Sequence, residues 1–151
     1  MIKVLCVGKI KEKFFKDAIA EYQKRLSKYT KLEIIEVEDI NLPNIIDIKK
    51  KEAELLEKYI GPKDYLITLE IDGKQISSLE LSKKLSTTLI ENSNIIFLIG
   101  GSYGIAESIK NRSNYALSFS KMTFPHQLFR VILLEQIYRS YKIMNNESYH
   151  K

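Results

Sequence analysis

Residues 94–104 have the sequence NIIFLIGGSYG, an apolar run that stops at two glycines, with a third glycine three residues later. A run of this length bounded by turn residues predicts a strand buried on both faces, as is typical of a parallel sheet. Glycine is needed where the backbone turns sharply or lets a ligand come close. In open α/β sheets, ligands bind at the carboxyl ends of strands. Gly100–Gly104 is therefore either a small-molecule site or a tight strand-to-helix turn without a ligand.

Strand and helix patterns alternate along the rest of the chain. Apolar or alternating runs predict further strands at Ile2–Gly8, Leu32–Glu38, Tyr65–Ile71 and Tyr115–Ser120. Apolar residues at helical spacing predict helices at Lys11–Tyr29, Asp47–Ile60, Ile105–Arg112 and Gln127–Met144, and another after Ser77. Such alternation indicates an α/β fold. We expect a five- to six-stranded, mostly parallel sheet between helices, in a single domain spanning residues 1–151.

Three local signals refine these boundaries. Ser77 and Glu80 form a capping box, because the hydroxyl and the carboxylate can each satisfy a free amide at the start of a helix. Asp72-Gly73 is a turn signal that would end the third strand. Thr123 is a candidate N-cap for the last helix, with Pro125 in its first turn, where proline loses no needed hydrogen bond.

The composition is that of an ordinary globular protein, with 44% hydrophobic and 28% charged residues. No apolar run reaches the ~18 residues of a membrane span, and the apolar N-terminal run is too short for a signal peptide. The single cysteine, Cys6, lies in the first predicted strand, where a buried small hydrophobe is its expected role. One cysteine also suits a reducing compartment, so we expect a cytoplasmic protein without a membrane partner.

The net charge of +5 is unevenly distributed. Residues 9–31 carry eight Lys or Arg against three acids, and residues 110–151 carry seven against two. The intervening residues 32–109 carry eight against fourteen. Basic ends around an acidic middle suggest an anionic partner such as nucleic acid. A lysine-rich solvated helix face explains the first basic segment equally well.

Common catalytic signatures are absent from the sequence. It has no phosphate-binding loop with a lysine, no GxGxxG and no GxSxG. Two histidines without cysteines or carboxylates at ligand spacing do not predict a metal site.

Chemically versatile residues gather late in the chain. Arg130 follows His126 by four residues, so the two can share one face of a helix. His126 is either a helix-start residue or a functional group. The terminal Tyr149-His150-Lys151 is either a disordered end or a group suited to stacking on a base and contacting phosphate.

Four segments together closely resemble one family. They are Phe97–Gly104 (FLIGGSYG), Leu117–Leu128 (LSFSKMTFPHQL), Leu134–Arg139 (LEQIYR) and Tyr149–Lys151 (YHK). Val7-Gly8-Lys9 and the total length match as well. Over essentially its whole length the chain resembles the bacterial large-subunit rRNA pseudouridine N3-methyltransferases of the SPOUT class.

The resemblance implies an α/β-knot fold, in which the C-terminal part threads through a loop to form a deep trefoil knot. The cofactor would be S-adenosylmethionine. The cofactor-binding positions of the family correspond to Leu69, Gly101, Ser120, Lys121, Met122, Thr123, Phe124 and Pro125, to which we add Gly100 and Gly104 of the same glycine turn. At Lys121 we expect contact through the backbone, because the family varies there between hydrophobic and polar side chains.

The resemblance also implies a homodimer, in which the tail of one subunit, here Tyr149-His150-Lys151, completes the site of the other. The reaction would methylate N3 of a pseudouridine in a stem-loop of large-subunit (23S) rRNA, in assembled ribosomes. No metal is implied.

Roles for individual residues follow from this chemistry, because the acceptor imide nitrogen must lose its proton. We expect His150, with its neighbour Tyr149, or His126 to assist that loss. Arg130 or Lys151 would grip the RNA backbone, with Arg139 as a further RNA contact. Two rival hypotheses are a related knot methyltransferase acting on a ribose hydroxyl or on tRNA, and a flavodoxin-like nucleotide- or RNA-binding module without turnover.

Overall fold

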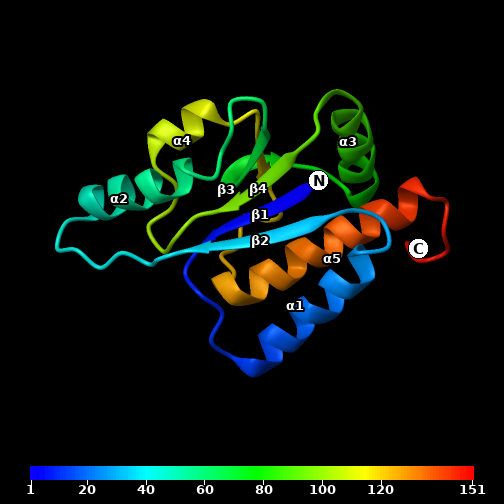
Figure 1. Ribbon diagram of the computed structural model, residues 1–151, viewed down its shortest axis with the longest axis horizontal. Helices are drawn as coiled ribbons and strands as arrows, with labels where there is room; N and C mark the ends of the chain where they lie inside the picture. Colours follow the sequence, from blue (N-terminus) through cyan, green and yellow to red (C-terminus); the bar gives the residue numbers. More distant parts are fainter.

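A computed structural model describes all residues, 1–151, as five strands alternating with five helices. The strands are β1 (Ile2–Val7), β2 (Leu32–Val37), β3 (Tyr65–Gln75), β4 (Ile95–Ile99) and β5 (Tyr115–Ser118). The helices are α1 (Lys13–Leu26), α2 (Ile45–Glu57), α3 (Ser78–Glu91), α4 (Glu107–Arg112) and α5 (His126–Met144). Figure 1 shows the sheet in the middle of the molecule, with α1 and α5 side by side on one side and α2 and α4 on the other.

The five strands form one sheet in the order β2-β1-β4-β3-β5, and every pair is parallel. β4 occupies the centre, with Phe97 opposite Val4 of β1 and Ile67 of β3. The predicted mostly parallel α/β sheet is thus confirmed, with five strands. Parallel strands end at the same edge, so the residues that follow β3, β4 and β5 are brought together.

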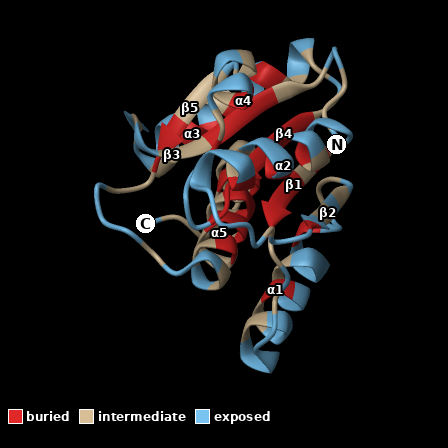
Figure 2. Cartoon of the chain, turned by 90° about the vertical axis from the view of Figure 1, so that its left-hand side faces the viewer, coloured by how far each residue is buried: buried red, intermediate tan, exposed pale blue.

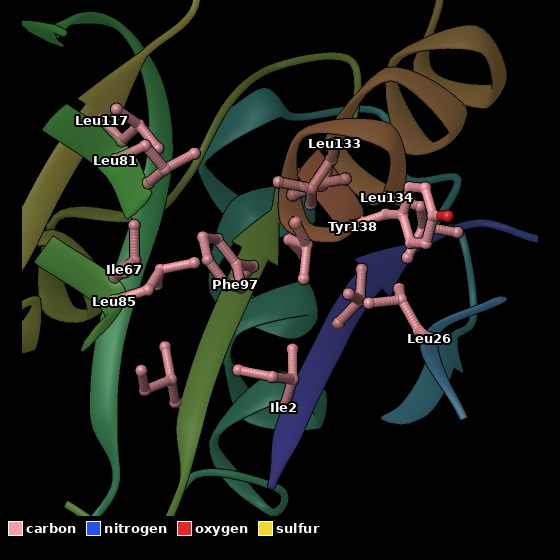
Figure 3. Close-up of a cluster of buried hydrophobic side chains, with 14 of the residues drawn as sticks. Ile2, Leu26, Ile67, Leu81, Leu85, Phe97, Leu117, Leu133, Leu134 and Tyr138 are labelled. Carbon is pink, nitrogen blue, oxygen red and sulfur yellow. The ribbon is translucent and has the colours of Figure 1, made fainter. Parts of the chain in front are cut away.

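Each face of the sheet carries its own hydrophobic core. One core joins alternate residues of the strands to α1, α3 and α5, and Phe97 lies at its centre (Figure 3). The other joins the intervening strand residues, including Leu98, to α2 and α4. β4 is therefore buried on both faces, and the exposed residues lie in the helices, the loops, β2 and the far end of β3 (Figure 2).

The helix boundaries confirm one local prediction and correct another. The capping box is present, with Ser77 Oγ accepting from the amide of Glu80, and Glu80 Oε2 accepting from the amide of Ser77. Thr123 does not cap α5. The helix begins at His126, with Pro125 itself as the N-cap residue, because the amide of Phe129 donates to the Pro125 carbonyl.

β3 is longer than predicted, because Asp72-Gly73 does not end it. The strand pairs with β5 up to Leu69, shifts register, and pairs again where Lys74 lies opposite Leu117. A Cβ on Gly73 would lie 2.8 Å from the Ala116 carbonyl carbon, so glycine permits this close return. The intervening residues bulge out of the ladder.

No helix of this chain combines the length and the apolar character needed to cross a membrane.

Cys6 should be inert in the native protein. It is completely buried in β1, and burial raises the pKa of its thiol to about 12. At pH 8 on the order of one thiol in ten thousand would be ionised, and the thiolate is the reactive form. We expect a thiol reagent that releases a chromophore on disulfide exchange to react with the native chain only as fast as the chain unfolds. In guanidinium chloride it should react with one thiol at once. Rapid native labelling would contradict this packing.

Candidate functional site

A cavity of about 390 Å³ opens at the carboxyl ends of β3, β4 and β5. Three segments form its walls: the glycine turn after β4, the β3 bulge, and the connection from β5 to α5. Of the predicted cofactor-binding residues, those that line it are Leu69, Gly100, Gly101, Gly104, Ser120, Met122, Thr123 and Phe124. Lys121 and Pro125 do not line it. The structure thus gathers most of the predicted set around one hollow.

The glycine turn is tightly packed. A Cβ on Gly100 would lie 2.7 Å from Ile105 Cγ1, and one on Gly101 would lie 2.9 Å from Glu52 Oε1. Gly104 has a φ of +87°, and its amide donates to the Gly101 carbonyl at 3.0 Å. No side chain fits at the first two positions, so backbone itself forms this wall.

The β5–α5 connection contributes a folded-back segment and aromatic rings. The Ser120 hydroxyl accepts from the amide of Met122 at 3.0 Å, and Ser118 Oγ donates to the Ser120 carbonyl at 3.1 Å. The Phe129 ring packs against Phe119 at a centroid distance of 5.0 Å and against Phe124 at 6.1 Å. These bonds and rings give the wall a defined shape and an apolar floor.

The β3 bulge supplies acidic residues that our sequence reasoning missed. Glu70 and Asp72 both line the cavity. The Thr68 hydroxyl donates to Glu70 Oε2 at 2.6 Å, and Lys110 Nζ lies 3.6 Å from the other Glu70 oxygen. The only available signal was Asp72-Gly73, which we interpreted as a turn. A carboxylate here can accept from ligand hydroxyl or ammonium groups.

The cavity combines apolar walls with backbone amides and carboxylates, and lacks a phosphate-binding lysine loop. This mixture suits a nucleoside with an aliphatic, cationic tail better than a triphosphate. No group of three or more His, Cys, Asp or Glu side chains in the chain could hold a metal ion.

His126 and Arg130 are brought together at the first turns of α5. His126 is exposed at the rim of the cavity. Arg130 is only 2% exposed, its Nη1 lies 2.5 Å from Glu36 Oε2, and its Nη2 donates to the Gly8 carbonyl at 3.2 Å. In the single chain the guanidinium is held by these two partners, and its expected contact with the RNA backbone stays a prediction. The arginine ties the start of α5 to β2 through Glu36 and to the segment after β1 through Gly8.

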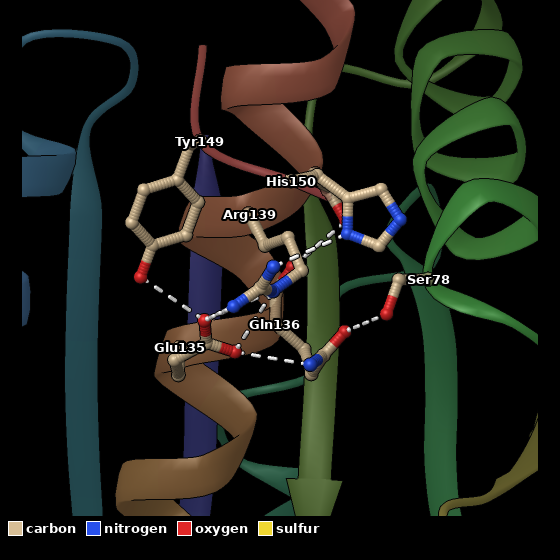
Figure 4. Close-up of polar contacts among 7 residues, drawn as sticks. Ser78, Glu135, Gln136, Arg139, Tyr149 and His150 are labelled. Atoms are coloured by element: carbon tan, nitrogen blue, oxygen red, sulfur yellow. Dashed lines mark hydrogen bonds and ion pairs between the residues drawn. The ribbon is translucent and has the colours of Figure 1, made fainter.

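The C-terminal tail is ordered against the far half of α5 (Figure 4). Glu135 accepts from Arg139 Nη2 at 2.6 Å and from the Tyr149 hydroxyl at 3.2 Å. Arg139 Nη1 lies 3.1 Å from His150 Nδ1, and its guanidinium lies 4.7 Å from the centre of the Tyr149 ring. Burial and the adjacent Glu135 carboxylate raise the pKa of Tyr149.

This network gives the tail residues a position apart from the cavity. None of Tyr149, His150, Lys151 and Arg139 lines it in the single chain. In the single chain, Arg139 contacts Glu135, Tyr149 and His150. The expected contacts of Arg139 and Lys151 with RNA stay predictions.

Comparison with known proteins places the whole chain in one family. The model of a family described as "Predicted SPOUT methyltransferase" matches residues 1–150. A protein of Methanococcus vannielii named "Putative ribosomal RNA large subunit methyltransferase H" is 54% identical, over 99% of each chain. That relative is archaeal, so the similarity is not confined to bacterial proteins.

A solved structure gives an independent view of the fold. The chain superposes with a TM-score of 0.58 on "a probable methylase family protein from Haemophilus influenzae Rd KW20". The match covers 99% of this chain and 70% of the other, at 11% identity, so it shows a shared fold alone.

Substitution of Gly101 tests the glycine wall. In Gly101→Ala the new methyl would meet the Glu52 carboxylate at 2.9 Å and Val7 Cγ1 at 3.2 Å. Glu52 is buried, so we expect a loss of about 1–3 kcal/mol in the free energy of urea unfolding. We also expect weaker binding of S-adenosylmethionine in calorimetry, because the displaced turn narrows the cavity.

Gly61→Ala is the matched control. Its methyl would meet Asp64 Oδ2 at 3.0 Å, but Gly61 is remote from the cavity lining. It should lose stability without losing cofactor affinity. Equal cofactor affinity in the Gly101 and Gly61 variants would refute the assignment of this wall.

Proposed function

The chain belongs to the SPOUT methyltransferase family, and on that premise we propose that it methylates N3 of a pseudouridine in large-subunit ribosomal RNA, with S-adenosylmethionine as the methyl donor. The observation that carries the proposal is the convergence of the glycine turn and the Ser120–Phe124 segment on one cavity. The 54% identical relative, whose name specifies the large ribosomal subunit, supports the RNA class. A ribosomal substrate places the reaction in the cytoplasm.

The cavity fits the proposed donor in size and chemistry. Gly100 and Gly101 present bare backbone, which suits hydrogen bonding to the edge of an adenine. Leu69, Phe119 and Phe129 provide apolar surface for the ring, and Glu70 and Asp72 provide acceptors for ribose hydroxyls or the ammonium group. The donor supplies a methyl group that is already activated on sulfonium sulfur. The protein therefore contributes mainly orientation and exclusion of water.

The acceptor nitrogen reacts as an anion. N3 loses its proton, its electron pair forms the new bond to the methyl carbon, and the electrons of the carbon–sulfur bond remain on sulfur. The proton needs an acceptor near N3, and His126 and His150 are the two histidines of the chain. His126 stands at the rim of the cavity, whereas His150 is held against Arg139.

A homodimer explains the position of the tail. His126 and Arg139 are thirteen residues apart on α5, which corresponds to about 20 Å along the helix axis. The ordered tail therefore lies at the opposite end of α5 from its own cavity. We propose that Tyr149-His150-Lys151 completes the cavity of a second subunit. We also propose that the C-terminal part of the chain forms the trefoil knot of the α/β-knot fold.

Methyl transfer to ribosomes tests the function directly. Ribosomes from a strain lacking this modification would be incubated with the protein and methyl-labelled S-adenosylmethionine. We expect one label per large subunit, in a nucleoside that mass spectrometry identifies as 3-methylpseudouridine. Label in tRNA, or on a ribose oxygen, would replace this proposal with the corresponding knot methyltransferase. Cofactor binding without transfer to any RNA would favour a binding module.

Removal of residues 149–151 tests the tail. The truncated chain should bind S-adenosylmethionine with unchanged affinity, because the tail does not line the cavity of its own chain. Methyl transfer to ribosomes should be lost. Mixing the truncated chain with a Gly101→Ala chain should restore part of the activity, since a mixed dimer has one intact cavity facing one intact tail. A truncated chain with full activity would contradict the proposed role.

A further inference from the structure

A second groove, of about 450 Å³, lies beside the cofactor cavity. It runs over the carboxyl ends of β1 and β2, past the glycine turn, to the first turns of α5. Gly101, Ser102 and His126 line both hollows. The two hollows therefore adjoin along these three residues. Methyl transfer requires such adjacency, because the reacting atoms must approach to about 3–3.5 Å.

The groove differs chemically from the cavity. Val7 is its one hydrophobic lining residue. Lys9 and Lys11 supply donors, and Glu38 and Asp39 supply acceptors. The lining has three cations and two carboxylates, and its third cation, Arg130, is already paired with Glu36, so the groove does not favour a free phosphate. These groups suit a neutral heterocycle that has both carbonyl oxygens and N–H groups, as an imide base does.

Arg130 gives a second, independent indication of a ligand. It lines the groove, its side chain is 3% exposed, and its Nε is the one buried side-chain nitrogen or oxygen in the chain without a hydrogen-bond partner. An unpaired buried donor costs about 1–3 kcal/mol. A carbonyl oxygen held beside Arg130 would recover that cost.

The start of α5 adds positive potential at the same place. The helix has no side-chain cap and no acidic residue in its first turn. The free amides of a 19-residue helix therefore face the shared wall at His126 without a compensating charge. Such an environment stabilises negative charge that develops on the carbonyl oxygens when an imide nitrogen is deprotonated.

We propose that this groove is the acceptor-base subsite, in which Lys9, Lys11 and Arg130 hold the carbonyl oxygens of the flipped-out uracil ring. The inference rests on the proposed function and specifies where its substrate binds. Glu38 and Asp39 also line the groove, where they can accept from the ring N–H groups. As N3 forms its bond to the methyl carbon, its proton passes to His126, which lines both hollows.

The test replaces the two exposed lysines, which leaves the core intact. Lys9→Ala/Lys11→Ala should lower the single-turnover rate of methyl transfer at saturating ribosomes by at least about tenfold, because charged hydrogen bonds to the reacting base are lost. Its affinity for S-adenosylmethionine in calorimetry should be unchanged. The matched control is Lys50→Ala/Lys51→Ala, which removes the same charge from exposed positions on α2, across the sheet. The control should keep the wild-type rate.

Arg130→Lys provides a second variant that retains the positive charge in the buried pair with Glu36. It should fold, bind the cofactor and lose rate at saturating ribosomes.

Five outcomes overturn the proposal. A raised KM with an unchanged saturating rate would make the lysines phosphate contacts of the RNA, and loss of cofactor affinity would assign them to the cavity. If Lys50→Ala/Lys51→Ala lowered the transfer rate equally, the loss of rate would be a general effect of removing positive charge. Absence of transfer by the wild-type chain would overturn the proposed function and this inference together, whereas wild-type transfer with unaffected groove variants overturns the subsite alone.

Discussion

The burial of β4 on both faces is the constraint on which the rest of the structure depends. All five of its residues, Ile95–Ile99, are enclosed, and the strand pairs with β1 on one side and β3 on the other. A strand walled in this way can meet a ligand only at its end. The chain leaves that end through Gly100 and Gly101, where Ile105 and the Glu52 carboxylate leave no room for a Cβ. Core packing and the candidate site are therefore parts of one arrangement.

The helix α5 connects the chemically distinct regions of the molecule. Its first turns border the cavity and the polar groove, its middle packs into the larger core through Leu133, Leu134 and Ile137, and its last turns hold the tail. The Arg130–Glu36 pair ties its start to β2, and the Glu135–Arg139 pair orders its end. Both pairs use an arginine to position an end of α5.

Much of the fold was accessible from the sequence, because the signals involved are local. The apolar run at 95–99, the helical spacing and the Ser77–Glu80 capping box each depend on residues close together in the chain, and each was confirmed. The predictions at Asp72-Gly73 and Thr123 were wrong for a common reason. Pairing of Lys74 with Leu117 continues β3 beyond a turn signal, and the Phe129–Pro125 bond starts α5 beyond a candidate cap. Both contacts override a local preference.

By itself, the sequence determined the α/β class, the central strand and the glycine turn, because periodicity and glycine placement act over a few residues. The family resemblance further indicated which residues after β3, β4 and β5 to group together. Only the tertiary structure decided that Arg130 is buried against Glu36, that the β3 bulge turns Glu70 and Asp72 into the cavity, and that Lys9 and Asp39 share a groove. These relations join residues that lie far apart in the chain, and the strand order and register that bring them together are set by the packing of the whole sheet.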